Sequence, residues 1–345
     1  MTKQSLSLDE AVKFLQEQRA RKRDYIVPVR ELAMGIGNKL VWKDQARTLR
    51  PLGHEQLAAF VKIPMDYYRR CLEVHPGVLA TQVNSWLGTK RDDQEDARMV
   101  RCIDDEVRAV LSSRYRRVDS LFVLSRALEG LKMTGLPFRI ESMDATDQKM
   151  HMKAVFTDAR LARELKPGDV VSAGVHIWDD EVGRGSWGVA PFSWVLACKN
   201  GATHNKSSHR GRHIGRNLDS ENVQEFSQEA IDADDNALGL KIRDLVVRYG
   251  NEQFFENNIV GPMREALGDV LAKDASEARK VVEQLGKAQL FAQNEIDATL
   301  AEFLRSNDYS RYGLGNAVTF VAQQSETYER SCELEEVGGS LLVSN

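Results

Sequence analysis

The middle of the chain alternates apolar and polar residues in three successive runs, as strands with one buried face do. The runs span residues 138–141, 150–156 and 171–178, and the last comes close to a strict period of two. A turn over residues 179–185 leads to a fourth predicted strand, from 186 to about 198, which completes a hairpin. This pattern predicts an antiparallel sheet of about four strands.

Segments with helical periodicity precede and follow the predicted strands in the sequence. Residues 7–23 begin with the capping box Ser-Leu-Asp-Glu, and residues 120–133 carry apolar side chains at three- and four-residue steps. A longer helix is predicted from Asp219 or Ser220 to about Arg248. Its predicted buried stripe consists of Val223, Phe226, Ala230, Ala233, Ala237 and Leu240. Residues 277–305 also read as helical, and a final helix follows.

These elements predict an α+β fold in which the sheet packs on helices and a helical C-terminal region follows. We expect an N-terminal mixed region (1–110), an α+β core (111–250) with a basic loop at 199–216, and an acidic helical region (251–345). Before residue 110 the chain reads as several short helices, with extended runs only at 25–29 and 39–42.

If the apolar faces of the first three strands meet helices, the opposite face of the sheet collects cationic and aromatic side chains. These side chains belong to Arg139, His151, Lys153, His176 and Trp178. We therefore expect an exposed, basic and aromatic sheet face beside the basic loop.

Charge is distributed unevenly along the chain. The formal net charge is −4, and residues 219–345 hold 24 Asp and Glu against 11 Lys and Arg. Residues 182–218, in contrast, contain no Asp or Glu but several Lys, Arg, His and Trp. Cationic groups interleaved with aromatic rings suit a single-stranded nucleic acid, because they neutralise phosphates and offer surfaces for base stacking.

The candidate nucleic-acid-binding residues are therefore the cations of this segment, the outward face of the sheet and the arginines near residue 115. They are Lys199, Lys206, Arg210, Arg212, Arg216, Lys153, Arg139, His176, Trp178, Arg184, Arg114, Arg116 and Arg117. A basic loop that is only solvated, or that pairs with acidic helices of the same chain, is the alternative.

Catalytic and metal chemistry is less well supported. Cys198, His204, His209 and His213 offer soft ligands, but their spacing matches no compact zinc module and their neighbours are basic. The acidic turn at 179–181 could bind Mg²⁺, although three acids at a hairpin tip are more often solvated. No phosphate-binding loop, nucleophile elbow or metalloprotease helix motif occurs. We expect neither a cofactor nor a metal, and the residues make no positive case for an enzyme.

The chain of 345 residues contains no apolar run long enough to span a membrane, and its first residues lack the apolar region of a signal peptide. Its four cysteines are scattered, so no disulfide framework is expected. These features predict a cytoplasmic protein.

Several motifs resemble a phage- and plasmid-borne family of unknown function, the domain-of-unknown-function family 932. They are Leu-Ser-Ser-Arg-Tyr-Arg-Arg-Val-Asp at 111–119, Gly-Val-His-Ile-Trp-Asp-Asp-Glu-Val-Gly at 174–183, Cys-Lys-Asn-Gly at 198–201, Arg-His-Ile-Gly at 212–215 and Tyr-Gly-Leu-Gly-Asn-Ala at 312–317. The chain departs from the family pattern at residues 178–180, where Asn-Ser is usual. The family carries no biochemical function.

The order of elements is also similar to the core of RecT-type single-strand annealing proteins, an analogy of topology alone. We expect a single-stranded DNA-binding protein of a mobile element that anneals strands as a homo-oligomeric ring or filament. An interaction module using the acidic C-terminal third, or a phosphate-ester enzyme using the acidic turn and His176, are the alternatives.

Overall fold

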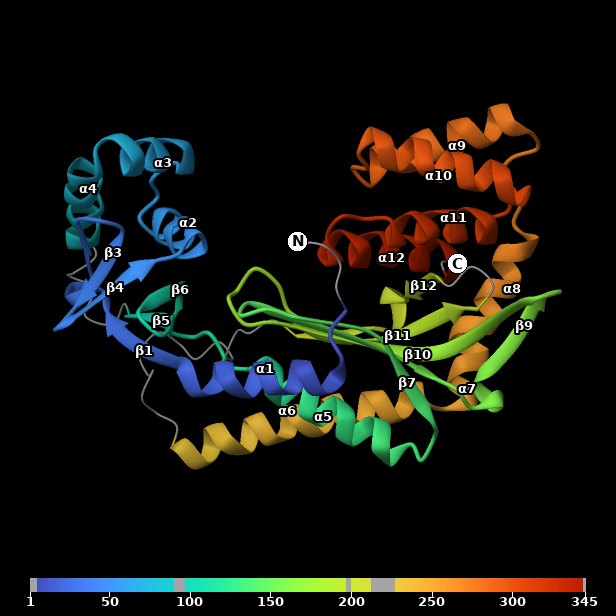
Figure 1. Ribbon diagram of the computed structural model, residues 1–345, viewed down its shortest axis with the longest axis horizontal. Coiled ribbons are helices and arrows are strands. Elements are labelled where there is room, and N and C mark those ends of the chain that lie inside the picture. Colours follow the sequence, from blue (N-terminus) through green and yellow to red (C-terminus); the bar gives the residue numbers. More distant parts are fainter. Residues whose placement is uncertain (1–4, 90–96, 197–199, 212–226, 344–345) are drawn as a thin grey trace.

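The computed structural model describes residues 5–89, 97–196, 200–211 and 227–343. It is an α+β protein with two separate sheets, one of six strands and one of seven, and helices on both (Figure 1). In these ranges no helix is both long and apolar enough to cross a membrane. The predicted fold class is confirmed, but the sheets have more strands than the four expected.

The six-stranded sheet lies in the N-terminal part of the chain. Its strands are β1 (Lys22–Pro28), β2 (Ala33–Gly35), β3 (Lys39–Trp42), β4 (Gln45–Leu49), β5 (Ala97–Ile103) and β6 (Glu106–Ser112), in the order β1-β5-β6-β4-β3-β2. Helices α2 (Pro51–Phe60), α3 (Met65–Val74) and α4 (Pro76–Thr89) pack on it around a core that includes Leu57, Val83 and Val100.

The prediction of short helices up to residue 110 missed β5 and β6. Both strands are buried for most of their length, including Arg101 and Arg108, so they lack the alternation that marks a half-exposed strand. Arginines within them resemble surface residues in the sequence. Their burial is explained by ion pairs that only the folded chain brings together.

The seven-stranded sheet confirms the predicted strands and hairpin. It runs β12-β11-β10-β8-β7, with β9 also paired to β10 and β13 also paired to β11, and all its described pairs are antiparallel. The strands are β7 (Phe138–Ala145), β8 (Lys149–Phe156), β9 (Ala162–Lys166), β10 (Asp169–Asp180), β11 (Trp187–Val195), β12 (Asn200–Thr203) and β13 (His209–Gly211).

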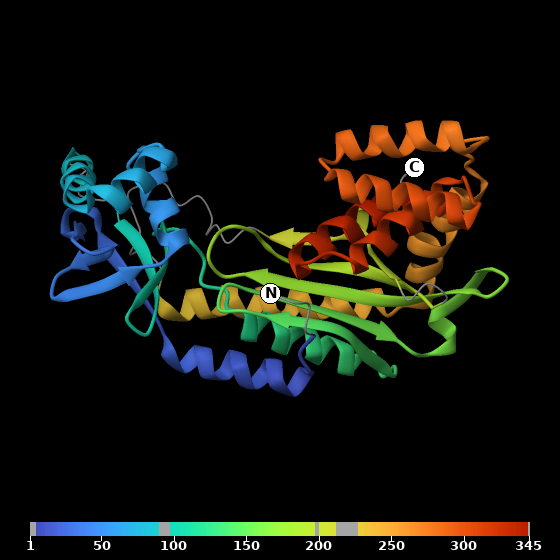
Figure 2. The same cartoon turned by 45° about the horizontal axis from the view of Figure 1, so that its top comes forward.

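One face of this sheet is covered by α1 (Leu8–Arg21), α5 (Ser120–Met133) and α6 (Gln228–Tyr249), with Leu15, Leu124 and Ile242 in the shared core (Figure 1). The capping box at Ser7 and Glu10 opens α1 as predicted. The other face is covered by the C-terminal helices α11 (Arg311–Gln323) and α12 (Tyr328–Val343), which Figure 2 shows above the strands. The sheet is therefore the middle layer of three.

The remaining C-terminal helices are α7 (Glu252–Phe255), the π-helical turn Glu256–Val260, α8 (Gly261–Gly268), α9 (Ala275–Ala288) and α10 (Gln293–Ser306). The helix predicted over 277–305 is thus two helices. They are separated at Leu290, whose φ of 54° lies in the left-handed region.

The predicted apolar stripe of the long helix is wrong at its three alanines, and Leu240 is half-buried. Ala230, Ala233 and Ala237 are exposed in α6, whereas Leu238, Ile242, Val246 and Tyr249 are buried against α5 and the sheet. Alanine is small enough to occupy either a buried or an exposed position, so the spacing of the alanines did not show which face of the helix is buried. Val223 and Phe226 lie outside the described residues.

Candidate functional site

The polar face of the seven-stranded sheet is buried. His151 and Lys153 on β8 lie beside His176 and Trp178 on β10, with His176 paired to Lys153 and Trp178 paired to His151 in the strand register. Helix α12 covers this face, and Lys153 is only 3% exposed. The expectation of an exposed working face is therefore wrong for Lys153, His176 and Trp178, because the alternation marks two faces without saying what covers each.

Lys153 forms a buried ion pair with Glu335 of α12. Its ammonium group also lies 4.8 Å from the centroid of the Tyr328 ring. Burial alone would lower the pKa of Lys153, but the facing Glu335 carboxylate, together with Tyr328 and Cys332, holds that pKa well above the ordinary value. Lys153 thus binds α12 to the sheet in its charged form.

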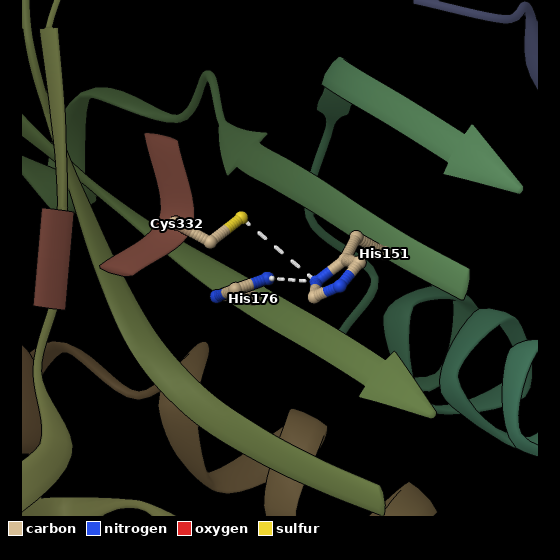
Figure 3. A group of neighbouring side chains, drawn as sticks. All are labelled: His151, His176 and Cys332. Atoms are coloured by element: carbon tan, nitrogen blue, oxygen red, sulfur yellow. Dashed lines mark hydrogen bonds between the residues drawn. The ribbon is translucent and has the colours of Figure 1, made fainter. Parts of the chain in front are cut away.

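Next to this ion pair, two histidines and a cysteine converge (Figure 3). His151 Nδ1 lies 3.2 Å from His176 Nε2 and 3.8 Å from Cys332 Sγ, and all three ligand atoms lie within 4.8 Å of one another. Burial lowers the pKa of His151 to about 3 and that of His176 well below its usual value, with Lys153 adding to both effects. Both imidazoles are therefore neutral at physiological pH.

Sequence reasoning missed the contribution of α12 to this cluster. Tyr328, Cys332 and Glu335 recur at steps of four and three residues, so they share one face of a helix. Tyr, Cys and Glu at this spacing on the C-terminal helix form a signal that could have been found in the sequence. Their partners on β8 and β10 are far away in the sequence and could not.

Arg210 connects the buried face to the surface. Its guanidinium lies 5.0 Å from the centre of the Trp178 ring and 2.8 Å from Glu336 of α12. Trp178 is 8% exposed, with Arg210 over its ring and Gly188 against it, so the ring offers little surface to a base. Arg210 itself is exposed, as are Lys206 and His209 beside it.

The remaining arginine candidates are dispersed over the described surface. Arg139 pairs with Glu141 and lies over Trp194, Arg184 pairs with Glu55 at 2.7 Å, and Arg116 pairs with Asp234 and Asp235 of α6. Arg114 and Arg117 are exposed, and Arg117 lines a groove with α1 and α5. Lys199, Arg212 and Arg216 lie outside the described residues.

The acidic turn is also buried, contrary to the expectation of a solvated tip. Glu181 forms ion pairs with Lys22 at 2.5 Å and Arg108 at 2.8 Å, and it accepts a hydrogen bond from the backbone N–H of Ser120. Asp179 accepts a hydrogen bond from the Ser120 hydroxyl. Cations of the chain itself hold Glu181, so this carboxylate is not available for Mg²⁺.

The soft ligands expected near the basic loop do not form one group in the described structure. His204 is buried and bonds to Ser193, whereas His209 lies 3.3 Å from the hydroxyl of Tyr249. Cys198 and His213 lie outside the described residues.

Comparisons with protein-family models, with curated proteins and with solved structures find no match to this chain. The resemblance to the phage- and plasmid-borne family thus stays a prediction that rests on its motifs.

Proposed function

We propose that the protein binds single-stranded nucleic acid, with DNA favoured, along the exposed edge of the seven-stranded sheet formed by residues 205–211. The observation that supports this proposal is that residues 205–211 of the acid-free segment form a 3-10 turn (Asn205–Ser207) and the outer strand β13, which expose Lys206 and Arg210 respectively. Lysine and arginine on a sheet edge can neutralise successive phosphates of a strand that runs along it.

The local charge supports binding of an anion. Among the described residues, one ion pair uses a cation of residues 205–211: Arg210 pairs with Glu336, and both partners are partly exposed. A phosphate can compete for Arg210 because exposed ion pairs contribute little free energy. Arg212 and Arg216 follow directly in the sequence and add two cations to the same segment.

The phosphate-ester enzyme has less support. It requires an accessible acidic turn and an accessible His176, yet both are buried and bound by side chains of the same chain. The proposed role in annealing requires no cofactor.

Assembly into a ring or filament is part of the same proposal, but its suggested contact needs revision. The sequence suggests a contact between the acidic surface of the long helix and a basic patch of a neighbouring subunit, at residues 19–23 or 114–117. Arg116 instead pairs with Asp234 and Asp235 of its own chain. Light scattering at low and high salt, with and without single-stranded DNA, tests whether other surfaces join subunits.

The DNA-binding proposal is tested by measuring affinity across a salt series with single-stranded DNA, single-stranded RNA and duplex DNA. Replacing Lys206 and Arg210 with Gln is expected to weaken binding and to reduce the log–log salt slope by about 1.4, since each contact on a single strand contributes roughly 0.7. The matched control replaces Lys280 and Lys287 of α9, which are exposed on a distant helix. Equal slopes for all three proteins would contradict the proposal, as would absence of binding by the unaltered chain.

A further inference from the structure

Of the three atoms that converge beneath α12, His151 Nδ1 lies at about ligand–ligand separation from the other two, and all three lie within 4.8 Å of one another. In a tetrahedral zinc site with Zn–N of about 2.0 Å and Zn–S of about 2.3 Å, neighbouring ligand atoms lie roughly 3.3–3.6 Å apart. The observed 3.2 Å between the imidazole nitrogens and 3.8 Å between Cys332 Sγ and His151 Nδ1 are close to these values. Binding such an ion requires the third pair, His176 Nε2 and Cys332 Sγ, to approach to a similar separation from within 4.8 Å, which side-chain rotation alone can supply.

The surroundings of His176 provide an independent observation. Its Nε2 points to the cluster, while its Nδ1 lies 3.0 Å from the hydroxyl oxygen of Thr203 on β12. A histidine that binds a metal through one nitrogen usually donates the other N–H to an oxygen atom, which fixes the tautomer and the ring orientation. Thr203 is buried and is placed to accept that hydrogen bond.

We propose that His151, His176 and Cys332 form a structural site for a thiophilic divalent cation, Zn²⁺ above all, that fastens α12 to the seven-stranded sheet. Two ligands come from adjacent strands and the third from the covering helix, so one ion joins two layers of the fold. The inference is independent of nucleic-acid binding, which uses a different surface.

Binding of Zn²⁺ would change the charge of this buried cluster. Burial raises the pKa of the Cys332 thiol to about 12, so the thiol is protonated without a metal, and binding of Zn²⁺ releases that one proton to solvent. The neutral imidazoles already have the form that binds a metal. The ion and the thiolate together leave one positive charge, while Lys153 and Glu335 cancel each other. Glu335, one helical turn after Cys332, remains paired with Lys153, so the fourth position is left to solvent or another donor.

The test uses the full chain without a histidine tag, expressed in medium containing zinc and purified under reducing conditions. Metal analysis is expected to find about one zinc per chain. Protein produced with Co²⁺ in place of zinc is expected to show thiolate-to-cobalt charge transfer and the intense visible bands of tetrahedral Co²⁺. X-ray absorption of the zinc protein should give one sulfur and two or three nitrogen or oxygen ligands.

Variants then assign the ligands. Cys332→Ser should abolish the charge-transfer band, whereas Cys71→Ser, a buried free cysteine of the N-terminal part, should retain it. Thr203→Val should keep the band but weaken metal affinity by about 10- to 100-fold, as loss of a supporting hydrogen bond does.

The proposal is overturned if the purified chain contains no zinc and the protein produced with Co²⁺ shows no charge-transfer band. It is also overturned if that band is unchanged in Cys332→Ser. If Cys332→Ser does not fold, the sulfur count from X-ray absorption of the unaltered protein decides, since a site without sulfur excludes Cys332. Weak binding that is lost on gel filtration also counts against a structural site.

Discussion

Arg108 and Glu181 form a buried ion pair of 2.8 Å between the two sheets of the protein, although 73 residues separate them. Arg108 comes from β6 of the six-stranded sheet, and Glu181 follows the last residue of β10 in the seven-stranded sheet. Lys22 of β1 binds the same carboxylate, and Arg101 donates to the Glu181 carbonyl. The acidic turn is therefore the joint between the two parts of the fold.

Replacing Glu181 with Gln is the first test of this joint. The variant leaves Lys22 and Arg108 buried without their counter-charge, so we expect a loss of about 3–5 kcal/mol in the free energy of unfolding. Denaturant titration followed by circular dichroism measures it. The control is Asp104→Asn, which removes the exposed ion pair with Arg21 and should change stability little. Similar losses in both variants would show that Glu181 is not the joint.

The sequence predicted those elements whose apolar and polar side chains lie on opposite faces, whatever covers the polar face. The strands β7, β8 and β10 and the helices α1 and α5 follow from such alternation. The sequence-based prediction failed at β5 and β6, because Arg101 and Arg108 are buried charges whose partners lie elsewhere in the chain. Alternation also distinguished the two faces of the sheet, but it could not reveal that α12 covers the polar one.

The candidate site shows the same limit. Arg210 and Lys206 were predicted from local composition and lie on the surface, where local composition is informative. Lys153 was predicted as a phosphate contact, but it forms an ion pair with Glu335, which lies 182 positions later in the sequence. Pairings over such distances depend on topology, which a single sequence does not specify.

His204 gives a prediction about pH. Burial lowers its pKa to about 4 from the ordinary value of 6.5, so the unfolded chain binds a proton that the folded chain does not between these values. The contribution of neutral His204 to the free energy of unfolding is therefore complete above pH 6.5. It is lost as the pH falls to about 4, which lowers the free energy of unfolding by at most about 3 kcal/mol. Stability measured from pH 7 to 4 should fall less steeply in His204→Gln. The exposed His75 serves as control, and its replacement should leave the slope as it is.

Gly188 gives a prediction about packing in the sheet. It lies opposite Trp178 in the strand register, and the indole of Trp178 lies over it. A Cβ at this position would stand 2.1 Å from the ring, which is closer than any real contact allows. Gly188→Ala must therefore displace Trp178 and, with it, Arg210, at a cost of about 1–3 kcal/mol or more.

The matched control for this substitution is Gly77→Ala in α4, where an added Cβ meets nothing within 4 Å. Alanine favours the helix there and reduces the entropy of the unfolded chain, so this variant should be neutral or more stable by up to about 1 kcal/mol. Thermal unfolding and the fluorescence of the tryptophans report both effects. Because Arg210 rests on Trp178, Gly188→Ala should also weaken DNA binding, whereas Gly77→Ala should not. Equal stability of the two variants would mean that Trp178 does not lie across Gly188 in solution.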